Sequence, residues 1–297
     1  MIPRTLFSSD HETFRDTVRK FLENEAVPHH EEWEQTGQVP KALWRKAGEQ
    51  GFLCPMVSEE YGGIDADFLY SVVVSEEISR AGLTGIGWGL HTEIVAPYIE
   101  HYGSEEMKQR LLPKMVSGEL IGAIAMSEPG AGSDLQGVKT TAVKDGDHYI
   151  LNGSKTFITN GQNADIIIVV AKTDPSKGAK GTSLIIVEEG MEGFEKGKNL
   201  KKVGMKAQDT SELFFQDVKV PAANLIGDEG MGFVYLMQEL PQERLGIAIN
   251  GLAMAESAFQ HTLDYVKERK AFGQRVADFQ NTQFKLAEMR TKLDVAR

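Results

Sequence analysis

The first 120 residues carry apolar side chains at the spacing of amphipathic helices. The pattern predicts a first helix with Asp10 as its N-cap, Val18 and Leu22 on one face, and Pro28 as a stop signal. Further apolar helical faces follow, separated by turn residues, at Leu43–Phe52, Leu69–Ile78 and Met107–Leu112, with breaks expected at Tyr61–Gly63 and Pro113. This segment is predicted to be a helical bundle.

From Ile121 to about Asp228 the pattern changes to short runs of β-branched residues between turn residues. Connections are expected at Asp145-Gly146 and Lys180-Gly181. A small β-barrel or sandwich is the simplest packing of the runs that read as strands, which are Ile166–Val170, Ser183–Val187 and Leu213–Phe215.

The helical period returns after Gly230, with Phe233 and Leu236 on one face. Pro241 is expected to interrupt this helix, and a second long helix is predicted to run to about Lys270. The order of elements predicts an α+β fold with an N-terminal helical domain at residues 1–120, a middle β-barrel domain at 121–228 and a partial C-terminal helical domain at 229–297.

The last residues remain in helical register up to Arg297. Phe284, Leu293 and Ala296 share one apolar face, and no Gly or Asn follows them as a cap. We therefore expect the sequence to stop within a helix.

Composition places the chain among ordinary globular proteins, with 297 residues, 41% hydrophobic and 25% charged. A net charge of −11 disfavours nucleic acid and anionic membranes as general partners. The only cysteine, Cys54, excludes an internal disulfide and suits a reducing compartment. No apolar run approaches the roughly 20 residues that span a bilayer, so we expect the chain to have no transmembrane segment.

Candidate chemistry begins at Ala125–Asp134, which combines a turn with hydroxyl donors. Gly130 and Gly132 allow backbone geometry that a Cβ would block, and successive N–H groups in such a turn can bind an anion. Ser127 and Ser133 add donors on either side. By itself, such a segment is more often an ordinary surface loop.

A second motif follows at Leu151–Gly161, where Asn152-Gly153 is a hairpin signal and Thr156–Thr159 has the character of a strand. These two motifs, together with Lys206–Thr210 and Glu268–Gly273, resemble the acyl-CoA dehydrogenase family in order and spacing. The resemblance runs over essentially the whole chain.

The resemblance implies removal of hydrogens from Cα and Cβ of an acyl-CoA thioester, in which a base takes the α-proton and the β-hydrogen leaves as hydride to FAD. It further implies a role in fatty-acid β-oxidation, electron-transfer flavoprotein as the acceptor, and a homotetramer. Family members continue with further helices, on which assembly, flavin retention and full activity depend. The implied location is the cytoplasm of a bacterium or the mitochondrial matrix of a eukaryote.

Glu239–Arg244 resembles the long-chain and isovaleryl branches of the family, whose base precedes the arginine, and the chain is most similar to the long-chain branch. Glu243 is therefore the candidate catalytic base and Arg244 a candidate substrate contact. Alternatively, Glu243 is a first-turn glutamate stabilised by the helix dipole. The dipole would lower its pKa and an apolar substrate would raise it, and we expect desolvation to prevail once substrate binds.

Other positions match the family's cofactor and substrate contacts. Arg269, Phe272 and Gln280 match residues that meet the FAD of a neighbouring subunit. Ser133 also matches a substrate contact. The positions expected to bind FAD within one chain are Ile124, Met126, Ser127, Gly132, Ser133, Phe157, Ile158 and Thr159.

Two alternatives to the dehydrogenase remain at this point. The first is a flavin-dependent acyl-CoA oxidase on the same fold, which differs in the access of oxygen to the reduced flavin. The second is a non-catalytic scaffold that binds acyl-CoA or flavin. No metal site is expected, because the histidines show no ligand spacing with cysteine or acidic partners.

Overall fold

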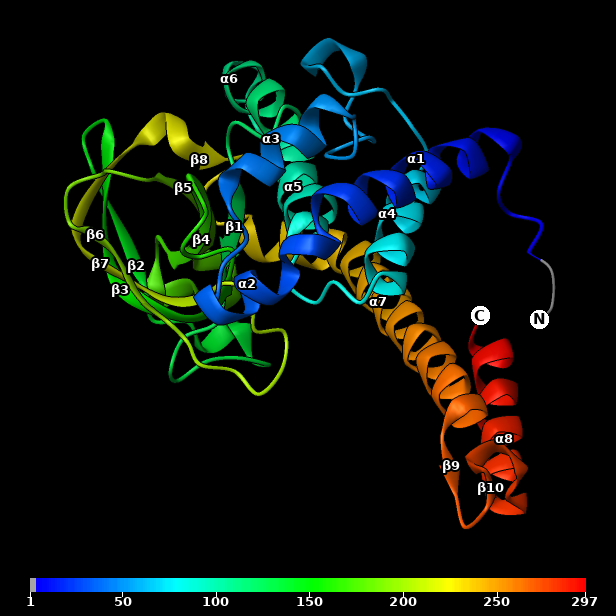
Figure 1. Ribbon diagram of the computed structural model, residues 1–297. Coiled ribbons are helices and arrows are strands. Elements are labelled where there is room, and N and C mark those ends of the chain that lie inside the picture. The colour runs from blue at the N-terminus through cyan, green and yellow to red at the C-terminus, as the bar shows by residue number, and fades with distance from the viewer. Residues whose placement is uncertain (1–3) are drawn as a thin grey trace.

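A computed structural model describes residues 4–297. Helices form the first part of the chain, a β-sheet the middle, and two long helices the last part (Figure 1). The N-terminal helices are α1 (Ser9–Glu25), α2 (His30–Thr36), α3 (Lys41–Glu49), α4 (Phe68–Arg80), α5 (Ala96–Tyr102) and α6 (Glu105–Val116), with a π-helical segment at Leu90–Val95 before α5.

The start of α1 differs from the prediction by two residues. Ser8 is the N-cap, because its Oγ accepts a hydrogen bond from the His11 amide while the His11 ring accepts one from the Ser8 amide. Asp10 lies in the first turn, where its charge is favourable for the helix dipole. The helix ends at Glu25, shortly before Pro28, as predicted.

Both proline breaks predicted within helices are wrong. Pro113 lies inside α6, and Pro241 lies inside α7, which runs unbroken from Gly232 to Glu268. A proline in a helix costs about 3 kcal/mol, which the burial of neighbouring apolar side chains offsets. Leu112 packs beside Pro113 with no exposed surface, and Leu236 does so in the turn before Pro241.

Eight strands form one sheet in the order β6-β7-β3-β2-β4-β5-β8, with β1 parallel to β4. The path has β6 and β8 as its two ends, and β2 joins β4 through the single pair Thr141–Lys172. The middle domain is thus a curved sheet of two linked halves. The strands are β1 (Gly122–Ala125), β2 (Thr141–Asp145), β3 (His148–Thr159), β4 (Ile166–Lys172), β5 (Thr182–Glu188), β6 (Phe194–Asn199), β7 (Thr210–Pro221) and β8 (Leu225–Ile226).

The hairpin predicted at Asn152-Gly153 is wrong, because β3 continues through both residues. The register against β7 shifts between Leu151 and Gly153, so the glycine belongs to a β-bulge. A Cβ on Gly153 would lie 2.4 Å from the hydroxyl of Thr140, and this close approach explains the glycine. The turn between β2 and β3 is at Gly146, within the predicted connection, where φ is 62°.

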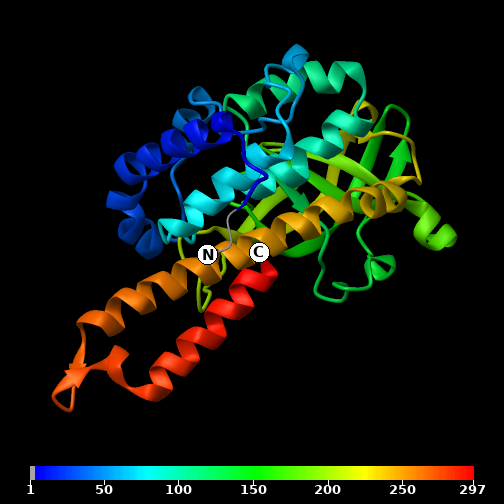
Figure 2. The ribbon, with the colours of Figure 1, turned by 90° about the vertical axis from the view of Figure 1, so that its right-hand side faces the viewer.

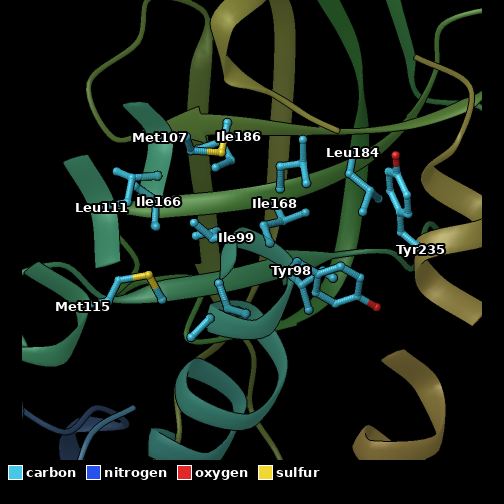
Figure 3. Close-up of a cluster of buried hydrophobic side chains, with 14 of the residues drawn as sticks. Tyr98, Ile99, Met107, Leu111, Met115, Ile166, Ile168, Leu184, Ile186 and Tyr235 are labelled. Carbon is cyan, nitrogen blue, oxygen red and sulfur yellow. The ribbon is translucent and has the colours of Figure 1, made fainter. Parts of the chain in front are cut away.

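Strand β4 is buried on both faces, which explains its unbroken apolar run. Ile167 and Val169 pack on one face, in a cluster with side chains from the other strands such as Tyr149. Ile166 and Ile168 face the opposite side, where they pack against residues of α5 and α6 such as Ile99 (Figure 3). The sheet and the N-terminal helices therefore share one core.

The second half of α7 and α8 (Gln280–Ala296) form an arm that extends away from the sheet in both views (Figures 1 and 2). A short hairpin of β9 (Lys270–Ala271) and β10 (Gln274–Arg275) lies at its tip. The helical register predicted up to the end of the sequence is confirmed by α8. Within residues 4–297, no helix is both long and apolar enough to cross a membrane.

The burial of β4 predicts a difference between two matched substitutions. Val169→Ala should lower the free energy of unfolding by about 2 kcal/mol or more, because it removes two methyl groups from a closed core. Val143→Ala, on the exposed face of β2, should change it by less than about 0.5 kcal/mol. Urea unfolding of both variants checks this, and equal effects would contradict the assigned core.

Candidate active site

Glu243 is held in the interior by a tyrosine from another part of the chain. It lies on α7 with 7% of its surface exposed, and the hydroxyl of Tyr98 on α5 donates a 2.7 Å hydrogen bond to its Oε1. Because α7 is continuous, Glu243 follows Gly232 by about three turns. The interpretation of Glu243 as a first-turn glutamate stabilised by the helix dipole is therefore wrong.

Glu243 and Glu239 lie one turn apart, yet their pKa values shift in opposite directions. Burial raises the pKa of Glu243, and the hydrogen bond from Tyr98 only partly opposes this effect. Burial also acts to raise the pKa of Glu239, but hydrogen bonds from His101 and Tyr102 outweigh it and the pKa is lowered. Of the two carboxyl groups, Glu243 is the one whose affinity for a proton is raised.

A cavity of about 410 Å³ lies beside Glu243. Thr159, at the end of β3, lines the same cavity, so the fold brings together two residues from the candidate list. Most of the remaining wall is apolar and comes from α4, the segment before α5, the loop before β7, and α7. These side chains are Val74, Ile78, Leu90, Ile94, Met205 and Ile247.

A buried lysine fixes the loop that follows β1. The Nζ of Lys155 on β3 donates to the carbonyl oxygens of Met126 (3.0 Å) and Val170 (2.7 Å) and to Oε1 of Glu128 (2.9 Å). Burial lowers the pKa of Lys155 to about 8, against the opposing effect of Glu128. In addition, the Thr156 amide donates to the carbonyl oxygen of Ser127 at 2.9 Å. Met126–Glu128 is therefore tied to β3 and β4 together.

Phe157 lies next to this loop in an unusual conformation. Its φ is 60° and 70% of its surface is exposed, at a point where β3 shifts register against β7 between Lys155 and Ile158. A left-handed φ at an aromatic residue is strained, and the strain turns the ring outward. Ile158 is buried in the sheet, so its neighbour Phe157 is the one that offers an apolar surface to a ligand.

The remaining candidates near the loop differ in burial. Ile124, on β1, is buried in the core, whereas Gly132 and Ser133, in the loop, are exposed. A Cβ on Gly130 or Gly132 would meet no atom within 4 Å. The expectation that the protein's own backbone requires these glycines is wrong, and the space beside the loop is open to a ligand.

Only Glu243 and Thr159 of the candidates line the cavity, and four others lie neither on β1 or β3 nor in the loop after β1. Arg244 is exposed, although its charge acts to lower the pKa of the adjacent Glu243. Arg269, Phe272 and Gln280 lie in the arm at or near its tip, far from the loop and from β3 in both views (Figures 1 and 2). Phe272 is 96% exposed with φ of 51°, and its ring lies edge-to-face with that of Phe279, with centroids 6.3 Å apart.

The sequence did not reveal three residues that shape the site. Tyr98 and Glu93 occupy an ordinary helical pattern, and only the fold brings them to α7. Lys155 stands inside the second motif and could have been selected there, but burial of its side chain is not visible in the pattern. Glu93 lines the cavity that contains Glu243, and burial raises its pKa to about 7.

Comparison with known proteins places this geometry in context. Family profiles of the acyl-CoA dehydrogenase N-terminal, middle and C-terminal domains match residues 8–119, 123–218 and 230–297. The mitochondrial long-chain specific acyl-CoA dehydrogenase of Sus scrofa is 54% identical over 296 residues, which are 99% of this chain and 69% of the relative.

Two solved structures are similar over the same region. The acyl-CoA dehydrogenase of Geobacillus kaustophilus is 57% identical with a TM-score of 0.96, and the match covers 99% of this chain and 78% of that one. The acyl-CoA dehydrogenase of Bacillus anthracis complexed with FAD is 37% identical with a TM-score of 0.91, covering 98% and 50% of the two chains.

The half-buried carboxyl of Glu93 predicts a pH-dependent stability. Its pKa is about 7 in the folded protein and ordinarily 4.5, so the folded state holds a proton that the unfolded state has lost between these values. Its contribution to stability is therefore present below pH 4.5 and is lost as the pH rises towards 7. Glu93→Gln should flatten this part of the profile in urea unfolding between pH 5 and pH 8, whereas Glu60→Gln, at an exposed site, should leave it unchanged. Identical profiles for wild type and Glu93→Gln would disprove the assignment.

Proposed function

Since this chain belongs to the acyl-CoA dehydrogenase family, we propose that it catalyses the FAD-dependent α,β-dehydrogenation of acyl-CoA thioesters to trans-2-enoyl-CoA. The observation that carries the proposal is Glu243, a buried carboxylate of raised pKa in a largely apolar cavity that Thr159 also lines. The reaction is a step of fatty-acid β-oxidation. The relatives reported above are named dehydrogenases, which favours this activity over an oxidase or a scaffold.

The residues around the loop after β1 fit FAD. Phe157 presents an exposed ring beside the loop, and the space around Gly132 is open. Ser127 and Ser133 carry hydroxyl groups, and so does Thr159, which lines the cavity. When bound, FAD would accept the β-hydrogen together with its electron pair. In this proposal Met126, Ser127, Gly132, Ser133 and residues 157–159 hold the cofactor, and Ile124 supports them from the core.

Glu243 removes the α-proton of the thioester. Its raised pKa makes proton transfer from a weakly acidic C–H more favourable than transfer to an ordinary carboxylate. The hydroxyl of Tyr98 holds the carboxylate in one orientation and stabilises its charged form. An apolar acyl chain in the cavity would exclude water and raise the pKa of Glu243 further.

The size of the apolar surface supports a long acyl chain. A second cavity of about 260 Å³ shares Ile78, Met205 and Asn250 with the first and continues along α7 to His261. The helix rises about 1.5 Å per residue, so the distance along α7 from Glu243 to His261 is roughly 27 Å. We infer that long-chain acyl-CoA thioesters are the substrates, in line with the name of the Sus scrofa relative.

The arm supports a homo-oligomer. Arg269, Phe272 and Gln280 belong to the segment from the end of α7 to the start of α8, which lies at the far end of the arm from the sheet (Figures 1 and 2). In an oligomer, the guanidinium of Arg269 would pair with the pyrophosphate of a neighbouring subunit's FAD. Electron-transfer flavoprotein is the proposed acceptor, in the mitochondrial matrix of a eukaryote or the cytoplasm of a bacterium.

Replacing the base should abolish turnover without abolishing binding. In Glu243→Gln, flavin reduction by a long-chain acyl-CoA should slow by at least about 10²–10⁴-fold, because the amide cannot accept the α-proton. The rate is measured by mixing the protein anaerobically with acyl-CoAs of different chain lengths and recording the flavin absorbance. Calorimetry should show acyl-CoA affinity close to wild type.

The control for this experiment is Glu268→Gln, at an exposed position near the end of the same helix. In this variant, the acyl-CoA should reduce the flavin at the wild-type rate. Rapid flavin reduction in Glu243→Gln would rule out Glu243 as the base.

Tyr98→Phe should move the pH profile of flavin reduction. Loss of the hydroxyl removes a hydrogen bond that favours the ionised form of Glu243, so the pKa of this base rises further. The acid limb of the rate profile should then shift to higher pH, while the rate at high pH stays within a few-fold of wild type. A lower rate with no shift of the limb would assign Tyr98 a structural role only.

A further inference from the structure

The acyl cavity contains a second carboxyl group that has no partner. Glu93 lines the cavity, and neither of its carboxyl oxygens makes a hydrogen bond or ion pair with any residue from 4 to 297. The group lies between two glycines. A Cβ on Gly246 would be 2.6 Å from Oε2 and one on Gly89 would be 3.7 Å from Oε1. The absence of a side chain at Gly246 makes room for the carboxyl, whereas the contact at Gly89 is an ordinary van der Waals distance.

The backbone around Glu93 is specialised. Leu90–Val95 is a π-helical segment, a rare conformation that is frequent at functional sites. His91 and Thr92 are buried by contacts elsewhere in the core, since His91 accepts from the Gly122 amide and Thr92 from the Cys54 amide. Glu93 is held from the other side by the Gln242 amide group, which donates to its carbonyl oxygen at 3.1 Å.

Glu93 lies close to the position at which the acyl chain of the proposed substrate would pass Glu243. Gly246 follows Glu243 by one turn of α7, so Glu93 lies beside the acyl chain shortly beyond the carbons that react. Asn250, one turn further, also lines the cavity, and its amide lies 3.5 Å from the hydroxyl of Ser75. The wall that faces the acyl chain beyond Cβ therefore carries polar groups.

An unpartnered carboxyl is unfavourable beside a plain methylene chain. Glu93 is half-buried, and covering its carboxyl with an acyl chain that offers no hydrogen bond costs free energy whether or not the group is ionised. Burial raises the pKa of Glu93 to about 7, so both protonation states are populated near neutral pH. A hydroxyl group can satisfy either state, because it donates to a carboxylate and accepts from a carboxylic acid.

We propose that this cavity selects acyl-CoA thioesters whose acyl chain carries a hydroxyl group a few carbons beyond Cβ, and that Glu93 hydrogen-bonds this hydroxyl. The inference rests on the proposed function and adds a substrate class to it. Glu93 is the specificity-determining residue, and Glu243 remains the base. Discrimination should be about tenfold or more, as for other sites in which a buried polar group is left unpaired by the wrong substrate.

The test compares a long straight-chain acyl-CoA with analogues of equal length that carry one hydroxyl at each position from C4 to C8. Calorimetric affinity and the rate of anaerobic flavin reduction are measured for wild type, Glu93→Leu and Glu93→Gln. Wild type should prefer at least one hydroxylated analogue by about tenfold. Glu93→Leu should lose this preference and bind the straight chain more tightly, whereas Glu93→Gln, which keeps hydrogen-bonding atoms, should retain most of it.

The outcomes separate this inference from the proposed function. Turnover of the straight chain without a hydroxyl preference in wild type, or with the same preference in Glu93→Leu, would overturn the role of Glu93 alone. If no acyl-CoA binds or reduces the flavin in wild type, both the function and the inference fail. Unfolding curves of the two variants verify that the fold is intact.

Discussion

The hydrogen bond between Tyr98 and Glu243 is the contact on which the candidate site depends. The ring of Tyr98 belongs to the core that α5 shares with β4, and its hydroxyl reaches α7 (Figure 3). One side chain therefore links the helical bundle, the sheet and the helix that carries the candidate base. Because the ring is fully buried, the orientation of the carboxylate is fixed by core packing rather than by a mobile loop.

The loop proposed to hold the flavin depends on a second buried interaction. The Nζ of Lys155 donates hydrogen bonds to two carbonyl oxygens and to the carboxylate of Glu128, next to the loop after β1. The Glu128 carboxylate also accepts from the amides of Lys139 and Thr140. Every charge in this network has a partner, as burial requires. Phe157 and Thr159 on β3 thereby keep a fixed position relative to Ser127 and its neighbours.

Much of the fold could be predicted from the sequence, because the strongest patterns are local. The continuous run at 166–170 is strand β4, and the helical register near Arg297 is α8. The predictions failed where packing outweighs local preference. Pro241 stays within α7, and Asn152-Gly153 becomes a bulge because Thr140 packs against the glycine. Each error follows from a short-range signal that long-range contacts override.

By itself, the sequence determined the order of the elements and the two motifs around the loop after β1 and β3, since these depend on residue type and spacing along the chain. The choice of Glu243 as the candidate base came from the resemblance of Glu239–Arg244 to two branches of the family. Only the tertiary structure decided the surroundings of that carboxyl. Tyr98 and Glu93 lie about 150 residues before it and become its neighbours through the packing of α5 and the π-helical segment on α7. A pKa depends on desolvation and nearby groups in space, and no pattern along the chain contains that information.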